Sequence, residues 1–318
     1  MKGIPACSIS TAIESLSSST LRQYDSTFKK WWLYCKQHNI SPLKAGPQDV
    51  IKYLQCTFET DPKVSYNTLN THRSALSLIL ESVGKDPAVT RVLKGFFRLR
   101  PPKRKYNITW DIKMVLDYFN SQADNEDLSL QLLTRKVASL LLLTTAQRLQ
   151  TLARIRVENV VIQPDRIIIT IPDHLKTTAR HRNQPALELP FFTENPKICV
   201  ASAITKYIEK TAPFRTEGQE FLFLTSRKPF MTASSQTIGN WIKKQIKDAG
   251  VDTRIFSAYS VKHAAVSAAV RYGVSFNDIR RTAGWSEGSM MFVKFYCCPL
   301  QPINSFAKVI LNNQNVNI

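Results

Sequence analysis

A basic segment with two adjacent prolines divides this chain into two parts. Residues 98–105 carry five positive charges, and Pro101 and Pro102 interrupt them. Proline lacks a backbone N–H group and disfavours a helical residue before it, so a helix arriving from the N-terminal side must end here. A chain of 318 residues is long enough for about two domains. We therefore predict two folded domains, with residues 101–107 as the linker between them.

The first part has the apolar spacing of short helices. Apolar side chains recur every three or four residues after Ser19-Thr20, which we expect to cap the first helix. Pro47 and Asp86-Pro87 mark the starts of two further helices, because proline is favoured in a first helical turn. Another helix is expected over 65–80. The pattern predicts a helical bundle over residues 19–100, and residues 1–18 precede it as an N-terminal extension.

The second part mixes helical spacing with short β-branched runs. Two such runs, residues 157–162 and 166–171, are separated by a proline-containing turn signal, and a third strand is expected at 186–190. We predict a mainly α domain with a small antiparallel β-sheet over residues 108–298, followed by a tail, residues 299–318. The helices are expected at residues 109–121, 128–143, 148–154, 197–210, 234–248, 260–271, 275–283 and 287–297.

The whole chain is strongly basic. It has 43 Lys and Arg residues against 24 Asp and Glu, a net charge of +19, with +10 on residues 1–107 and +9 on residues 108–318. An excess of this size repels itself unless a polyanion neutralises it, and its spread over both parts favours a nucleic acid held from two sides. No apolar run approaches the ~20 residues of a membrane span, and no helix pairs a Lys-rich face with a broad apolar face. We therefore expect no membrane partner.

The sequence lacks the common cofactor motifs. It has no glycine-rich phosphate-binding loop, no HExxH motif and no carboxylate cluster, and its six cysteines do not have zinc spacing. We therefore expect no cofactor, no metal and no small-molecule substrate, and free thiols in a reducing compartment inside the cell. Chemistry on a nucleic acid would then depend on a nucleophilic side chain and on cations that stabilise the phosphate.

Three side chains have the right chemistry for such a reaction. Arg148 follows the apolar run at residues 140–143, Lys176 comes just past a predicted strand, and Tyr296 lies on a short predicted helix. A charge next to an apolar run is costly unless it has a partner. Each residue also has an ordinary structural explanation: an arginine that reaches the surface, a solvated loop lysine, and an amphipathic core tyrosine. The three residues alone leave both interpretations open.

In their order and context, these residues resemble the tyrosine recombinases, the phage integrase family, over residues 19–300. The segments Gln147–Leu152 and Ala283–Tyr296 are most similar to eukaryotic mobile-element members of the DIRS and crypton type. The resemblance implies an N-terminal SAM-like helical core-binding domain and an α+β catalytic domain. It also implies a DNA-bound tetramer on double-stranded DNA. A helix in the tail, residues 299–318, would then dock on a neighbouring protomer or, alternatively, on its own domain.

The resemblance assigns a role to each matching residue. Arg148 looks like the first catalytic arginine, which clamps the scissile phosphate, and Lys176 looks like the hairpin lysine that protonates the 5′-leaving oxygen. Trp285 stands where the family has His or Trp, and its indole N–H would donate to a phosphate oxygen. Tyr296 looks like the nucleophile. The implied 3′-phosphotyrosyl link keeps the bond energy, so neither ATP nor a metal is implied.

One motif departs from the family. The family has His-x-x-Arg where this chain has Tyr259 and Lys262. Lysine keeps the charge but lacks the planar fork of arginine, and a tyrosine with a pKa of about 10 is a poor base, although it can hydrogen-bond a phosphate. His263 adjoins the motif, but adjacent helical residues point about 100° apart, which disfavours a slipped alignment. Two hypotheses stay open: an active strand-transferase, and a recombinase-derived DNA-binding protein that has lost its chemistry.

Other basic residues are expected to contact DNA. Some lie on the polar face of the first predicted helix, and others lie in or beside the linker, where three adjacent basic residues also favour a nuclear location. An RNA-binding protein is a third hypothesis, weakened by the absence of an aromatic motif that stacks on single strands. The predicted DNA-binding residues are Arg22, Lys29, Lys30, Arg73, Arg100, Lys103, Arg104 and Lys105.

Overall fold

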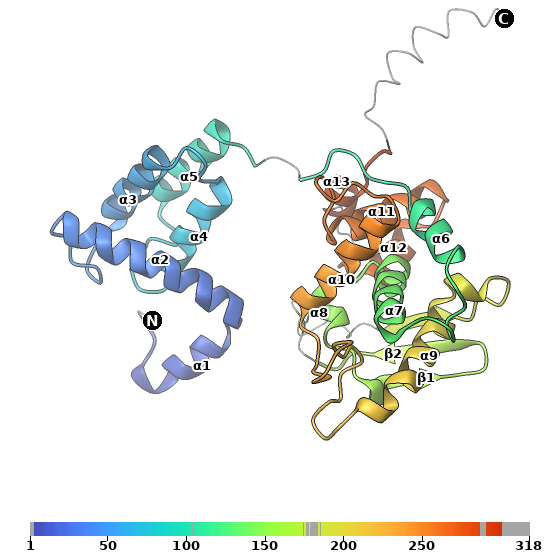
Figure 1. The fold of residues 1–318 in the computed structure, drawn as a ribbon. Coiled ribbons are helices and arrows are strands. Elements are labelled where there is room, and N and C mark those ends of the chain that lie inside the picture. The colour runs from blue at the N-terminus through green and yellow to red at the C-terminus, as the bar shows by residue number, and fades with distance from the viewer. Residues whose placement is uncertain are drawn as a thin grey trace, which may run out of the picture. The chain divides into compact units, whose positions relative to one another are not determined.

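The computed structural model describes residues 3–102, 105–173, 175, 178, 184, 186–286 and 291–300 of the chain. The chain divides into two compact units, residues 1–104 and 105–318, and each has its own hydrophobic core (Figure 1). Within the described ranges, no helix is both long enough and apolar enough to span a membrane.

Short capped helices build the first unit. They are α1 (Ile9–Glu14), α2 (Ser18–Gln37), α3 (Pro47–Thr60), α4 (Tyr66–Leu76) and α5 (Pro87–Leu99), after the 3₁₀ turn η1 (Ala6–Ser8). Ser17 Oγ accepts the N–H of Thr20 at 3.2 Å, so Ser17 caps α2 in place of the predicted Ser19-Thr20. Helix α1 lies in the predicted N-terminal extension. Ile9, Ala12 and Ile13 have the spacing of one helical face, but none of the residues of α1 is buried.

Aromatic rings form the centre of the first core. Trp31 and Tyr34 of α2 both pack against Tyr53 of α3, with ring centroids 5.2 Å apart in each pair. His72 of α4 stacks on Tyr53 at 5.6 Å, and a hydrogen bond of 3.1 Å joins its Nδ1 to the Tyr53 hydroxyl. Both residues are buried, so this hydrogen bond satisfies two polar groups that water cannot reach.

The second unit combines helices with one small sheet. Its helices are α6 (Lys113–Asn120), α7 (Leu130–Thr145), α8 (Leu149–Leu152), α9 (Val200–Thr211), α10 (Ser235–Asp248), α11 (Ser260–Arg271), α12 (Phe276–Ala283) and α13 (Met291–Tyr296), with 3₁₀ turns η2 (Val157–Asn159), η3 (Pro196–Ile198) and η4 (Ala212–Phe214). Its strands are β1 (Val160–Ile162), β2 (Arg166–Thr170) and β3 (Ala186–Pro190).

The three strands form an antiparallel sheet in the order β1-β2-β3. Ile167 and Ile169 of β2 pair with Leu189 and Leu187 of β3, and all four are buried, so one face of the sheet packs on the core. The predicted first strand is too long, because its first three residues form η2 instead. The predicted class, mainly α with a small antiparallel sheet, is confirmed.

Helix α7 lies at the centre of the second core. Eleven of its sixteen residues are buried, and it packs against α8, α9, α10 and α11 (Figure 1). A helix that is buried on most sides carries apolar residues nearly all round, which explains the continuous apolar run in this segment. Its C-terminal end therefore sits on a rigid support, and the chain that leaves this end leads directly to Arg148.

The segment before α6 belongs to the second unit rather than to a linker. The Tyr106 hydroxyl lies 2.8 Å from Ser257 Oγ, and Trp110 Nε1 donates to Ser260 Oγ at 2.9 Å. Both aromatic residues are buried. The predicted linker, residues 101–107, therefore includes side chains that pack on the start of α11.

Candidate active site

A left-handed residue at the end of α7 shapes the first edge of the site. Ala146 has φ +47° and ends the helix, so the following residues leave in a new direction. Gln147 turns inward and is buried, and its Nε2 donates to the carbonyl of Thr282 at 2.6 Å. Arg148 then precedes α8 in an extended conformation and is partly exposed. The left-handed conformation of Ala146 costs a non-glycine residue about 1–2 kcal/mol, so the surrounding packing must stabilise the turn.

The Gln147 side chain also packs against Gly284. Gly284 has φ +69° and ends α12, and a Cβ atom built there would lie 3.6 Å from both side-chain amide atoms of Gln147. Glycine adopts this left-handed conformation without the steric cost that Ala146 bears. The contact joins the end of α7 to the end of α12, and it sets the backbone directly before Trp285.

One face of α11 supplies a second group of side chains. Lys262 and His263 lie three and four residues after Tyr259, and Ser267 lies four residues after His263, which places them on the same side of the helix. Lys262 and His263 are 3% and 5% exposed, whereas Tyr259 is 44% exposed. The helix therefore presents a hydroxyl at its open end and two nitrogen-bearing groups deeper in the protein.

Tyr296 of α13 lies against this face. Its hydroxyl forms a hydrogen bond with the Tyr259 hydroxyl, and its ring stacks on His263 at 4.5 Å between centroids, with the planes 25° apart. The Trp285 ring lies 5.0 Å away. Ser267 Oγ donates to the Tyr296 carbonyl at 2.9 Å and accepts the N–H of Cys298, also at 2.9 Å. The phenol of Tyr296 is thus held at both its ring and its backbone.

Lys262 brings a cation to the same ring cluster. Its Nζ lies 4.1 Å from the Trp285 ring centroid and 5.6 Å from that of Tyr296, and it donates to the carbonyl of Ala283 at 3.2 Å. Burial, and to a smaller extent the positive charge of Arg148, lowers the pKa of Lys262 to about 7. No carboxylate in the described part of the chain forms an ion pair with Lys262. An anion bound here would favour its charged form.

Tyr259 stays protonated because of its surroundings. Burial raises its pKa most, and the hydrogen bond and the charge of Tyr296 raise it further, whereas Arg148 opposes them. Arg148 therefore acts electrostatically on both Tyr259 and Lys262. The structure brings five of the predicted catalytic residues into this one cluster, namely Arg148, Tyr259, Lys262, Trp285 and Tyr296. The sixth, Lys176, lies outside the described residues, on the connection between β2 and β3.

His263 and Ser267 belong to the site but were not in the predicted set. Neither ring nitrogen of His263 completes a hydrogen bond with a described residue, although the Phe295 backbone lies close enough to favour a protonated ring. Burial, with smaller effects of Lys262 and Lys105, lowers the pKa of His263 to about 4. The sequence signal for both residues was available, because they follow Tyr259 at helical spacing.

The predicted DNA-binding residues have different surroundings. On α2, Lys30 is exposed, Lys29 pairs with Asp25 at 2.7 Å, and Arg22 donates to the Ser18 carbonyl. Lys103 and Arg104 lie outside the described residues.

Two of the predicted arginines have intramolecular partners. Arg73 donates to Asn70 Oδ1 at 2.9 Å, and Arg100 stacks over the Phe58 ring at 3.6 Å and donates to the Asp61 carbonyl. Both side chains therefore stabilise the first unit.

Lys105 instead lies beside the active-site cluster. Its Nζ is 3.3 Å from Ser257 Oγ and 5.9 Å from the Tyr259 ring centroid. Lys105 is therefore the third cation near Tyr259, after Arg148 and Lys262.

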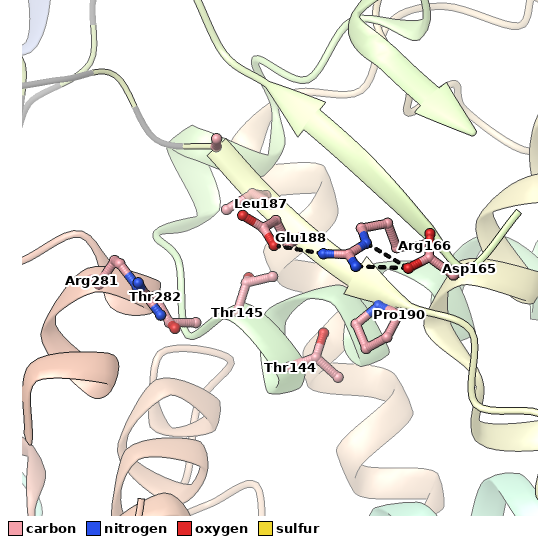
Figure 2. Close-up of a pocket in the computed structure, with 10 residues that line it drawn as sticks. Thr144, Thr145, Asp165, Arg166, Leu187, Glu188, Pro190, Arg281 and Thr282 are labelled. Atoms are coloured by element: carbon pink, nitrogen blue, oxygen red, sulfur yellow. Dashed lines mark hydrogen bonds and ion pairs between the residues drawn. The ribbon is translucent and has the colours of Figure 1, made fainter. Parts of the chain in front are cut away.

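Two cavities open on the second unit. The smaller, about 340 Å³, is lined by Tyr259 and by residues of α8 and α10, among them Gln150, Gln236, Asn240 and Lys243. The larger, about 500 Å³, lies between the end of α7, the β2–β3 pair and α12. Figure 2 shows Arg166 held there between Asp165 and Glu188, with Arg281 on the opposite side. None of the described catalytic candidates lines this larger cavity.

The described side chains do not form a metal-binding cluster. No group of three or more His, Cys, Asp or Glu residues with suitable geometry occurs among them. The chemistry that the cluster around Tyr296 can support is nucleophilic. A phenol lies beside buried and half-buried cations, and this combination suits attack on an anionic phosphorus centre.

Known proteins share both the sequence pattern and the fold. The model of the Phage integrase family matches residues 115–297. The integrase/recombinase xerD homolog of Selenomonas ruminantium is 22% identical over 281 residues, which cover 84% of this chain and 78% of that protein.

Two solved structures are similar in fold. A dimer of lambda integrase residues 75–356, bound to a COC′ core site, matches with a TM-score of 0.55 at 14% identity, over 90% of this chain and 91% of that one. The XerH site-specific recombinase in a post-cleavage complex with a palindromic difH substrate matches with a TM-score of 0.53 at 11% identity, over 85% and 71%.

Proposed function

The chain belongs to the phage integrase family, the tyrosine recombinases, and we propose that it is a DNA strand-transferase that breaks and rejoins duplex DNA through Tyr296. The observation that carries the proposal is the position of this phenol. Its hydroxyl bonds to that of Tyr259, and its ring lies between His263, Trp285 and the buried amine of Lys262. A nucleophile beside cations that form no ion pair with a described carboxylate matches the needs of phosphodiester attack.

The proposed reaction conserves one phosphodiester bond. The Tyr296 oxygen forms a bond to phosphorus as the bond to the 5′-oxygen breaks, and the phenolic proton leaves to solvent. The 5′-oxygen takes a proton from Lys176, the role that the family resemblance gives to this residue. A 3′-phosphotyrosyl link and a free 5′-hydroxyl result, and reversal of the step with another 5′-hydroxyl rejoins the strand. The bond energy remains in the link, so the proposal requires neither ATP nor a metal.

Arg148, Lys262 and Trp285 would stabilise the charge that develops on the phosphate. A preorganised donor of this kind contributes about 10²–10³ in rate. Lys262 supplies one point charge rather than the fork of an arginine, and its pKa of about 7 makes the charge sensitive to pH in the free protein. A bound phosphate favours the protonated amine. Substrate binding would therefore help to complete the site.

Double-stranded DNA is the proposed substrate, and a DNA-bound tetramer is the proposed assembly. The net charge of +19, spread over both units, supports a polyanionic partner. Exposed Lys30 on α2 and Lys105 beside Tyr259 offer cations in each unit. The lambda integrase relative is a DNA-bound dimer, which supports self-association on DNA.

We further propose a mobile-element protein that works in the nucleus. The segments Gln147–Leu152 and Ala283–Tyr296 support the subtype, and the basic run at residues 103–105 supports the location. A fluorescent fusion tests the location. Nuclear accumulation that is lost when residues 103–105 become alanine would support it, and uniform distribution would overturn it.

A second candidate is a DNA-binding protein without strand-transfer activity. Tyr259 and Lys262 favour it, because they replace the histidine and arginine of the family's motif. The variant Lys262→Arg separates the two candidates. A protein that becomes active only as Lys262→Arg has a degraded site, whereas an active wild type shows that lysine suffices.

Relaxation of supercoiled plasmid in EDTA tests the proposed function. We expect the wild type to relax the plasmid, because nicking and resealing through a phosphotyrosyl link need no metal. Tyr296→Phe, which removes one oxygen atom, should bind the plasmid equally well and relax none of it. Binding without relaxation by the wild type would contradict the proposal and favour the second candidate.

A further inference from the structure

We propose that Tyr259 acts on the nucleophile rather than on the DNA phosphate: its hydroxyl holds the Tyr296 hydroxyl in place and donates to the Tyr296 oxygen when this loses its proton. The inference rests on the proposed function only for what the phenolate then does. The contact itself is a property of the free protein, since the two hydroxyl groups are hydrogen-bonded to each other in the structure.

A single helix fixes the distance between the two phenols. Tyr259 stands at the first turn of α11, and Ser267, eight residues further along the helix, binds the Tyr296 carbonyl at 2.9 Å. The same Ser267 oxygen accepts the N–H of Cys298, so it holds the backbone on both sides of residue 297. His263, midway between Tyr259 and Ser267 on α11, stacks on the Tyr296 ring. The geometry therefore follows from the packing of α13 on α11, and it is present in the protein without DNA.

The number of donors decides what the Tyr259 hydroxyl can do. A phenol has one O–H group to donate. When Tyr296 is ionised, its oxygen can only accept, so the hydrogen bond between the pair must come from Tyr259. A hydrogen bond to a charged acceptor is about twice as strong as a neutral one. A Tyr259 hydroxyl that donates to the Tyr296 oxygen is not available to donate to a phosphate oxygen.

The charged groups around the pair favour one negative charge on it. Arg148 comes from the loop before α8, Lys262 from α11 and Lys105 from the segment before α6. His263 is neutral near pH 7, because burial lowers its pKa to about 4, and Tyr106 is the remaining titratable neighbour. None of the groups that shift the pKa of Tyr259 is a carboxylate. A single phenolate is therefore stabilised by cations that come from three segments of the chain.

The proton balance of the step is simple. Tyr296 releases its proton to solvent before attack, and Tyr259 keeps its own, since burial and the neighbouring Tyr296 raise the pKa of Tyr259. The phenolate oxygen of Tyr296 then bonds to phosphorus, and the hydrogen bond from Tyr259 weakens as the negative charge passes to the phosphate. Tyr259 is unchanged at the end of the step.

The direct test follows the ionisation of one phenol in the full-length protein without DNA. 3-Fluorotyrosine is placed at position 296, and its ¹⁹F resonance is titrated with pH in wild type, Tyr259→Phe and Tyr106→Phe. We expect Tyr259→Phe to move the titration midpoint up by about one pH unit, the loss of one hydrogen bond to a charged oxygen. Tyr106→Phe is the matched control, because the Tyr106 hydroxyl binds Ser257 and not Tyr296.

A second readout uses the reaction itself. Covalent protein–plasmid adducts are measured after rapid denaturation at a pH below the titration midpoint. We expect Tyr259→Phe to form adducts about tenfold more slowly, with plasmid binding unchanged. Fluorination of residue 296 eases ionisation, so it should restore more of the lost rate in Tyr259→Phe than it adds to wild type.

The outcomes separate this inference from the proposed function. An unchanged midpoint in Tyr259→Phe, or an equal shift in Tyr106→Phe, would overturn the inference. So would a rate loss in Tyr259→Phe that fluorination does not restore preferentially, because that result assigns Tyr259 to the phosphate. If the wild type forms no adduct while the midpoint still shifts, the hydrogen bond stands and the strand-transfer proposal falls.

Discussion

Both units contain a buried histidine stacked on a tyrosine, and the two pairs differ in one hydrogen bond. In the first unit, His72 Nδ1 bonds to the Tyr53 hydroxyl at 3.1 Å. In the second, His263 stacks on Tyr296 but completes no hydrogen bond with a described residue, and the Tyr296 hydroxyl binds Tyr259 instead. Burial lowers the pKa of both histidines to about 4. The two histidines are similarly buried and their pKa values are lowered alike. The tyrosine hydroxyl, however, binds the histidine in the first unit and a second tyrosine in the second unit.

The difference separates a core from a reactive site. The pair in the first unit satisfies its own polar groups and leaves nothing for a ligand, which is how buried polar groups usually stabilise a fold. The pair in the second unit leaves imidazole nitrogens that complete no hydrogen bond with a described residue, beside a phenol that is within reach of solvent. An unsatisfied buried group costs about 1–3 kcal/mol, so the second unit accepts lower stability around its proposed nucleophile.

The largest expected effect comes from the same one-atom deletion in the two pairs. Tyr296→Phe should abolish covalent adducts with DNA, because it removes the attacking oxygen, and it should leave thermal stability nearly unchanged. Tyr53→Phe should form adducts at the wild-type rate and melt at a lower temperature, because His72 loses its hydrogen-bond partner. Adduct assays and melting curves of the full chain check both. Loss of adducts in Tyr53→Phe at a temperature where the chain is folded would break the comparison.

The two buried lysines of the second unit extend the comparison. Lys262→Met should slow adduct formation about 10²–10³-fold, because it removes a preorganised cation beside Tyr296. Lys136 of α7 is also buried, its Nζ has no hydrogen-bond partner among the described residues, and burial lowers its pKa to about 8.

Lys136→Met is the matched control for Lys262→Met, because it removes a buried amine from the core of the same unit. It should keep the wild-type adduct rate and raise the melting temperature, since an unpaired buried amine is replaced by an apolar side chain of similar length. Equal rate losses in the two variants would show that a general disturbance of the core, rather than charge at the site, causes the effect.

Substitution of the two histidines should move stability in different ways. His72→Phe leaves the Tyr53 hydroxyl buried without its partner and should destabilise the protein by about 1–3 kcal/mol. His263→Phe removes ring nitrogens that have no described partner and keeps an aromatic ring, so it should change stability by less or increase it. Denaturant unfolding of the full-length variants measures both. A larger loss for His263→Phe would reveal a partner for its imidazole.

Acid should destabilise both units through their histidines. Folding lowers the pKa of each histidine from its ordinary value of 6.5 to about 4, so the folded state binds the proton less tightly than the unfolded state. Stability should therefore fall as the pH decreases from about 6.5 to about 4, and this contribution is constant below that range. Melting temperatures across this range should fall less steeply in His72→Phe and in His263→Phe than in wild type. A parallel slope in either variant would contradict burial of that histidine in neutral form.

Much of the fold could be predicted from the sequence. The runs at 166–171 and 186–190 indicated β2 and β3 because β-branched and alternating residues recur there. Helix α1 was not predicted, although Ile9, Ala12 and Ile13 have helical spacing; the helix is only six residues long and buries none of them. Tyr106 was assigned to the linker, since nothing local distinguishes a tyrosine that packs on α11 across some 150 residues of chain from a solvated one.

The site was predictable in composition but not in contacts. Helical spacing places Tyr259 and Lys262 on one face of α11, and family resemblance adds Arg148 and Tyr296. The hydrogen bond between the two tyrosines depends on how α13 packs on α11, a tertiary contact that the sequence does not express. Adjacent helical residues point about 100° apart, yet Lys262 and His263 both lie near the Tyr296 ring, because α11 is buried on several sides.

The most direct measurement identifies the residue that becomes linked to DNA. Protein is incubated with supercoiled plasmid in EDTA, denatured and digested with nuclease and protease, and the peptides that carry a nucleotide are sequenced by mass spectrometry. We expect a nucleotide attached through its 3′-phosphate to Tyr296 and to no other residue. A nucleotide on another side chain, or no modified peptide from a protein that binds the plasmid, would contradict it.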